Sequence, residues 1–217
     1  MRTDRQLQQD VIAELGWDAA IDASRIGVEA KDGIVTLSGH VESYAQKWSA
    51  ERAAQRVGGV KGVAVEIDVV LPGSSQRTDA DIASAARHAL EWNVLVPRDA
   101  IAVMVEDGHI TLSGDVEWAY VRTAAESSVR GLLGVKGVSN LIRIRPQIKP
   151  GDVKVKIEAA LQRRAHLDAR AISVEVDKGT VTLAGTVDSL AERVTVENAV
   201  WNAPGVQKVV DNLIVAR

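Results

Sequence analysis

The sequence repeats one pattern three times, and this repeat constrains the fold more than any other feature. The stretch DGIVTLSG at residues 32–39 returns as DGHITLSG at 107–114 and as KGTVTLAG at 178–185, at spacings of 75 and 71 residues. The same spacings relate GVKGV at 59–63, GVKGV at 134–138 and GVQKV at 205–209. A match at fixed spacing over such lengths is typical of tandem structural units. The 217 residues therefore divide into three units of about seventy residues each.

The boundaries between the units follow from where the spacing changes. We expect domains at residues 1–71, 81–146 and 152–217, joined by linkers at 72–80 and 147–151. The Gly and Ser residues of the first linker predict a flexible connection, whereas Pro146 and Pro150 predict a stiffer second one. Units of this size have thin cores, so we expect them to pack against one another.

Each unit begins with a predicted helix. In the second unit, Ile82, Ala86 and Leu90 follow helical spacing, and Asp79 or Asp81 is the expected N-cap. A second predicted helix follows later in each unit, over residues 43–57, 118–132 and 189–203.

Two alternating runs between these helices predict a β-hairpin. Ile26, Val28 and Ala30 alternate with polar residues, as in a half-buried strand, and Gly33 then allows a tight turn into the next run. A glycine further along, Gly39, is expected to let a helix pack closely on the sheet. A third run, residues 63–69 in the first unit, ends each unit and predicts a last strand.

The predicted fold class is therefore α+β, with three tandem αββαβ units. A right-handed crossover through the second helix places the last strand parallel to its neighbour, which gives a three-stranded mixed sheet. Both helices are expected on one face, because only one face is apolar in every copy. The other face, with Thr36, Ser38, Glu66 and Asp68 in the first unit, is expected to meet water or a partner.

Composition excludes several classes of function. The net charge of −3 provides no overall attraction for nucleic acid, and the absence of Cys excludes thiol chemistry and disulfides. We expect no transmembrane segment, because no stretch approaches the roughly 18 apolar residues required. The polar N-terminus predicts a cytoplasmic protein with Met1 as the natural start, and a periplasmic one where a signal peptide has been removed.

The repeated DGxVTLSGxV pattern, the cation in the following helix and the GVxxV turn resemble the BON domain family, named for bacterial OsmY and nodulation proteins. The resemblance covers nearly the whole chain in three copies. It implies an αββαβ fold, a non-enzymatic role in osmotic or envelope stress, and association with phospholipid or protein partners. A relative that binds potassium pairs this domain with a LysM domain, and no LysM-like segment occurs here.

Residues that suggest chemistry do not repeat as a set. Ser38 and Ser113 correspond to Ala184 in the third copy, and no His or acid keeps a fixed offset from them, so we expect no catalytic residues, cofactor or metal. The four histidines, His40, His88, His109 and His166, occupy different repeat positions. The repeated glycines are interpreted as structural turn residues: Gly33, Gly39, Gly108, Gly114, Gly179 and Gly185.

Two further sets are candidates for docking between domains or to a partner. The first is the cation of the second helix, Lys47, Arg122 or Arg193, each four residues before a Glu; the alternative is a solvated helix pair. The second is Trp17 and Trp92, at equivalent positions after the first helix; the alternative is the rim of a core.

Only residues 148–217 carry a net positive charge, and their cations gather near the first helix of the third unit. The candidate patch for an anionic partner, with a solvated helix face as its alternative, is Lys149, Lys154, Lys156, Arg163, Arg164 and Arg170. The leading hypothesis is a non-enzymatic stress-response protein that binds anionic phospholipid or a protein surface. The alternative hypothesis is a cytoplasmic sensor of a small ligand or a monovalent ion such as potassium.

Overall fold

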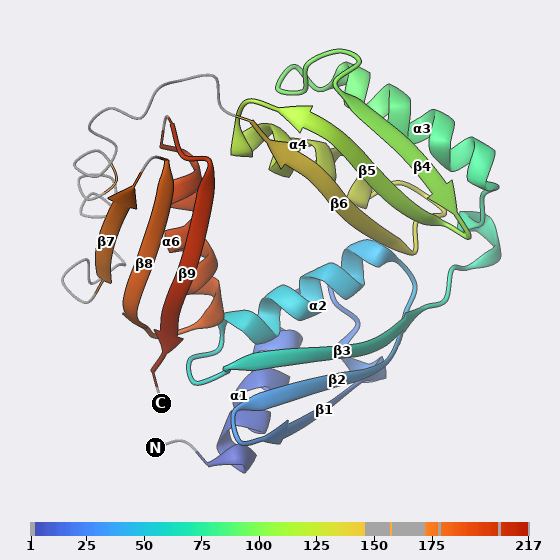
Figure 1. The fold of residues 1–217 in the computed structure, drawn as a ribbon. Helices are drawn as coiled ribbons and strands as arrows, with labels where there is room; N and C mark the ends of the chain where they lie inside the picture. The colour runs from blue at the N-terminus through green and yellow to red at the C-terminus, as the bar shows by residue number, and fades with distance from the viewer. Residues whose placement is uncertain (1–2, 146–156, 158–171, 178, 204, 217) are drawn as a thin grey trace.

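The computed structural model describes residues 3–145, 157, 172–177, 179–203 and 205–216. It confirms the α+β class, with three three-stranded sheets and their helices (Figure 1). The helices are α1 (Asp4–Trp17), α2 (Tyr44–Arg56), α3 (Asp79–Trp92), α4 (Ala119–Arg130) and α6 (Leu190–Trp201). The strands are β1 (Ile26–Lys31), β2 (Ile34–Val41), β3 (Gly62–Val69), β4 (Ile101–Glu106), β5 (His109–Val116), β6 (Gly137–Ile144), β7 (Ile172–Asp177), β8 (Thr180–Val187) and β9 (Lys208–Val215).

The three sheets share one topology. In the first, β1 pairs antiparallel with β2, and β2 pairs parallel with β3, so that Val28 lies opposite Leu37 and Leu37 opposite Val65. The second and third sheets, β4-β5-β6 and β7-β8-β9, have the same pairing. The mixed sheet predicted from the crossover rule is thus present in all three units.

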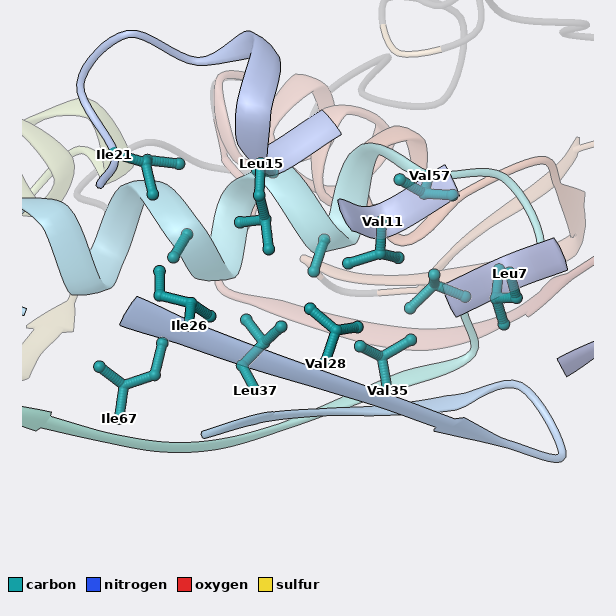
Figure 2. Packing of buried hydrophobic residues seen from close by; sticks show 14 of the residues in the cluster. Leu7, Val11, Leu15, Ile21, Ile26, Val28, Val35, Leu37, Val57 and Ile67 are labelled. Atoms are coloured by element: carbon teal, nitrogen blue, oxygen red, sulfur yellow. The ribbon is translucent and has the colours of Figure 1, made fainter. Parts of the chain in front are cut away.

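The core of the first unit lies between its sheet and both of its helices (Figure 2). From α1, Leu7, Val11 and Leu15 point toward Val35 and Leu37 of the sheet, and each of these side chains is at most 3% exposed. Burial of one large aliphatic side chain contributes about 1.5–3 kcal/mol, so these contacts fix the helices on one face. The second unit repeats this core with α3 and α4.

The hairpin turns have the backbone expected of an Asp-Gly pair. Asp32 and Gly33 have φ values of 54° and 83°, and Asp107 and Gly108 have 50° and 79°. Two consecutive positive φ values are those of the type I′ turn, whose twist matches the strands it joins.

The N-cap of α3 differs from the prediction, which was wrong for both aspartates. Thr78 is the cap: its hydroxyl accepts from the Asp81 N–H at 3.2 Å, and the Asp81 carboxylate accepts from the Thr78 N–H at 3.2 Å. This reciprocal capping box makes Asp81 the third residue of the helix. The Asp79 carboxylate instead accepts from the backbone N–H groups of Asp107 and Gly108, at 2.9 and 2.8 Å, which ties the helix to the hairpin turn.

The role expected of Gly39 is also corrected. Its φ is +116°, and a Cβ at this position would overlap the backbone carbonyl oxygen of Arg25, just before β1. Gly114 has the same relation to Ala100 in the second unit. The close approach that requires glycine is therefore between two backbone segments, not between a helix and the sheet.

The second helices, α2, α4 and α6, lie on the inner sides of the three units (Figure 1). Both α2 and α4 contact α6. The first residue of each second helix, Tyr44, Ala119 or Leu190, occupies the same repeat position, and these helices carry the contacts between units that are described next.

Candidate interaction surfaces

The repeated cations of the second helices make three different contacts. The Lys47 ammonium donates to the backbone carbonyl of Ile67 on β3 at 2.7 Å. Arg193 pairs with Asp211 on β9, with 2.6 Å between Nε and Oδ2. Arg122 lies over the Trp201 ring of the third unit, 5.7 Å from the ring centroid. One cation thus reaches a carbonyl, one a carboxylate and one a neighbouring unit.

The glutamates four residues after these cations have other hydrogen-bond partners. Glu51 accepts from Gln55 at 2.9 Å, and Glu197 accepts from the Trp201 indole at 3.2 Å. Glu126 accepts from Asn140 at 3.1 Å. Each of these hydrogen bonds joins two residues of the same unit.

Trp48 is the aromatic centre of the contact between the first and second units. The guanidinium of Arg130, from α4, lies 3.6 Å from the Trp48 ring centroid, and that of Arg52 lies 5.1 Å from it. A guanidinium over an indole contributes about 0.5–2 kcal/mol, with the larger values where water is excluded. Neither Trp48 nor Arg130 is among the docking candidates that the sequence suggested.

Tyr44 extends the same contact. Its ring packs against the apolar core of the second unit. Burial raises the pKa of the Tyr44 phenol above its ordinary value of 10.0, and the nearby Glu126 carboxylate adds to this effect. The neutral phenol is therefore the form that this contact accommodates.

Leu190 makes the corresponding contact between the third and first units, because it packs against both of their cores. Tyr44 and Leu190 occupy the same repeat position. The start of α2 thus contacts the second unit. The first half of α4, in the second unit, contacts the third unit through Arg122 and Trp201. The start of α6, in the third unit, contacts the first unit. The three contacts run in one cyclic direction.

Trp17 and Trp92 are both at the surface, with exposed fractions of 86% and 88%. Each is the last residue of the first helix of its unit. Because both indoles are this exposed, neither is buried against another unit. Two residues that sequence reasoning missed follow Trp92 in the chain: Val94 is 95% exposed and Leu95 is 51% exposed. We name Trp92, Val94 and Leu95 the apolar tip. Its signal in the sequence is an apolar run beyond the last helical turn.

The candidate anionic-partner patch, Lys149 to Arg170, lies outside the described residues, as does His166. Of the other candidate groups, Ser38 and Ser113 are half-buried on the sheet face away from the helices. His109 shares a hydrogen bond of 2.8 Å with Ser139 on the same face of the second unit, and among the described residues no carboxylate hydrogen-bonds this histidine. In the part of the chain with assigned structure, no His, Asp and Glu cluster suits a metal ion.

The sequence profile of the BON domain matches residues 3–70, 78–146 and 151–217, nearly the whole chain. The chain belongs to the BON domain family. The BON domains of this chain include the two that the structure describes from the first helix to the last strand, and the matched ranges show that the repeat is three tandem copies.

A relative from Escherichia coli strain K12, the osmotically-inducible protein Y, is 33% identical over 129 residues. The match covers 58% of this chain and 64% of the relative, so the aligned part is less than two thirds of the relative's length. It supports an OsmY-like tandem BON architecture.

Solved structures show weaker likeness. CdsD, a structural protein of the Type III secretion system of Chlamydia trachomatis, is 16% identical with a TM-score of 0.27, over 96% of this chain and 91% of that chain. The PrgH periplasmic domain is 10% identical with a TM-score of 0.22, over 89% of this chain and 96% of that chain. Within the described residues of the BON protein, no helix has the length and apolar character needed to cross a bilayer.

Proposed function

We propose that this chain is a non-enzymatic osmotic-stress protein that binds the surface of anionic phospholipid membranes. The observation that carries the proposal is the apolar tip, where Val94 is 95% exposed and Trp92 is 88% exposed. Most of the other valine, leucine and isoleucine side chains that the structure describes are buried or half-buried. The stress role is supported by the similarity to the osmotically-inducible protein Y of Escherichia coli.

The chemistry of the apolar tip suits a lipid interface. Indole rings prefer the headgroup level of a bilayer, where the ring is apolar and its N–H remains hydrated. Val94 and Leu95 can then enter the acyl boundary. Full transfer of such a side chain from water is worth about 1.5–3 kcal/mol, and electrostatic attraction to anionic lipid adds to it.

The first unit provides a natural comparison. Trp17 is equally exposed, but the residues at the positions of Asn93, Val94 and Leu95 are Asp18, Ala19 and Ala20. The Asp18 carboxylate accepts from the Ala20 N–H at 3.1 Å, as the Asn93 side-chain oxygen accepts from the Leu95 N–H at 3.0 Å. The two turns thus share this hydrogen bond, and they differ in the size of the side chains, alanines in the first unit and Val94 and Leu95 in the second. The proposal therefore assigns insertion to the second unit.

Charge near the tip is mixed. Exposed Arg87 and Arg98 flank the tip in the sequence, together with Glu91 and Asp99. We propose that the cations of residues 149–170 supply further attraction to anionic headgroups, as the sequence suggested. If these cations contribute, vesicle binding should weaken at high salt. The attraction between exposed charges more than about 10 Å apart is largely screened at 0.1 M salt.

Co-sedimentation of the full chain with vesicles tests the proposal. We expect binding to vesicles that contain phosphatidylglycerol and weaker binding to pure phosphatidylcholine. The variant Val94→Ala with Leu95→Ala, which copies the first unit, is expected to lose most of this binding. Leu133→Ala, which shortens another exposed apolar side chain (55% exposed), is the matched control and retains it.

Equal and negligible binding to both vesicle types would overturn the lipid assignment. If the double variant still binds anionic vesicles, the proposal is overturned as well, because the apolar tip would then have no part in the binding. If the apolar tip binds a protein partner instead of lipid, the same double variant would lose binding to that partner in the absence of lipid, and this result would also overturn the lipid assignment.

A further inference from the structure

The outer face of the second sheet, the face away from α3 and α4, differs from the outer faces of the other two sheets. Met104 and Leu141 lie on it with exposed fractions of 60% and 63%. The corresponding residues are Glu29 and Glu66 in the first unit and Glu175 and Asn212 in the third. In Figure 1 the strands β4, β5 and β6 lie in front of both helices of this unit. The outer faces of the first and third sheets each carry an exposed apolar residue elsewhere, Ile34 (46%) and Ile214 (68%), but only polar residues at these two positions. An apolar pair at these two positions is thus particular to the second unit.

Strand register places these two residues on one diagonal of the face. Met104 lies opposite Thr111 across the β4–β5 pair, and Leu141 lies opposite Ser113 across the β5–β6 pair. The central strand thus presents small hydroxyl side chains between two exposed apolar ones. An exposed sheet face with small residues between two apolar ones suits packing against a second sheet about 10 Å away.

The charges lie at the two ends of the same diagonal. At one corner, exposed Glu106 lies opposite His109. At the other corner, Arg143 and Arg145, with side chains 68% and 64% exposed, share the single carboxylate of Asp115 at 2.9 and 3.2 Å. This corner therefore keeps an excess positive charge, and the Glu106 corner carries a negative one.

We propose that a second copy of this chain docks on this face to form a twofold dimer. A 180° rotation about an axis that lies in the interface and crosses the diagonal brings Glu106 of one copy opposite Arg143 of the other, and brings the two apolar pairs together. A twofold interface requires such self-complementarity, since the same patch must serve both copies. The first unit lacks it, because Glu29 and Glu66 would bring carboxylates together at the centre.

The inference is tested by sedimentation velocity of the full chain over concentrations up to about 1 mM, which populate a dimer even where its dissociation constant is close to about 1 mM. We expect a concentration-dependent dimer. The variant Met104→Glu with Leu141→Glu, which copies the first unit, is expected to be monomeric over the whole range. Leu133→Glu, a charge added at an exposed apolar residue outside this face, is the control and still dimerises. Circular dichroism checks that each variant is folded.

A charge exchange provides a second test that does not depend on the apolar substitutions. Glu106→Arg alone and Arg143→Glu alone are each expected to weaken the dimer at least tenfold, and the two together to restore it, because the pairing then re-forms with reversed signs. A wild-type chain that stays monomeric up to about 1 mM overturns the inference. A dimer that survives Met104→Glu with Leu141→Glu, or that the double exchange fails to restore, overturns it as well.

Discussion

The guanidinium of Arg130 lies 3.6 Å from the ring centroid of Trp48, and these two residues belong to different units. Arg130 is at the end of α4, and Trp48 is in the first half of α2. The contact therefore joins the end of one second helix to the beginning of another, as Arg122 and Trp201 join the second and third units.

Removal of the Arg130 side chain is expected to weaken the contact between the first two units. Arg130→Ala should lower the free energy of unfolding by about 1 kcal/mol, the contribution of a partly desolvated cation–π pair. Urea denaturation measures this. Arg87→Ala, which removes a guanidinium 68% exposed and paired along its own helix, is the control and should change stability by less than about 0.5 kcal/mol. Equal effects of the two variants would contradict the assignment.

Tyr44 predicts a loss of stability in alkali. Its folded-state pKa is raised above the unfolded value of 10.0, mainly by burial, so folding favours the neutral phenol. The stabilisation from this group is complete below pH 10 and is lost as the pH rises through the folded-state pKa. Unfolding measured from pH 9 upward should show a steeper decline for the wild type than for Tyr44→Phe. Tyr120→Phe, which removes a phenol hydroxyl from a residue 46% exposed, is the comparison variant.

The ion pair between Arg193 and Asp211 should matter more than the exposed pairs. Its side chains are 35% and 17% exposed, and Asp211 also accepts from the Leu213 N–H at 2.9 Å. Asp211→Ala should destabilise the protein by about 2 kcal/mol, because a charged hydrogen bond is lost and a half-buried guanidinium is left unpaired. Glu42→Ala, which breaks the exposed pair with Arg25, should cost less than about 1 kcal/mol.

Asp211→Asn refines this prediction. The second unit carries Asn140 at the same repeat position, where its amide donates to the Arg122 carbonyl at 3.0 Å. The Asn variant is therefore expected to keep part of the stability that the Ala variant loses. An Asn variant as unstable as the Ala variant would show that charge alone matters at this position.

Two glycines should respond in opposite ways to alanine. Gly39→Ala forces a Cβ into the Arg25 carbonyl at a φ of +116° and should cost more than about 2 kcal/mol. A Cβ added at Gly16, near the end of α1, would meet no neighbouring atom within 4 Å. Gly16→Ala should therefore stabilise the protein by up to about 1 kcal/mol. Thermal unfolding of the two variants compares them directly, and a shift of the same sign in both would contradict this interpretation of Gly39.

Much of the fold was predictable because the three copies report on it together. The alternation at Val35 and Leu37, the Asp-Gly turn and the periodicity of the second helices recur, and each recurrence indicates local structure that neighbouring residues determine. The cap of α3 was missed because Thr78 and Asp81 act as a reciprocal pair, whereas each aspartate was considered alone.

The contacts between units were not predictable in the same way. Trp48 corresponds to Thr123 in the second copy, and Arg130 to Trp201 in the third, so no repeated pattern marks them. Their partners come from distant parts of the chain, and only the tertiary arrangement brings them together. The apolar tip had a local signal, but the equivalent alanines of the first unit make it look like an ordinary helix end.

The cyclic direction of the contacts through Tyr44, Arg122 and Leu190 has a consequence for how the units depend on one another. Each unit offers part of its second helix to one neighbour and receives part of another in return. Such head-to-tail contacts extend into filaments unless they close, and here the third unit closes them onto the first. One chain thus behaves as a closed ring of three subunits that are covalently linked. A unit separated from its neighbours would expose both of its contact surfaces, the one it offers and the one it receives.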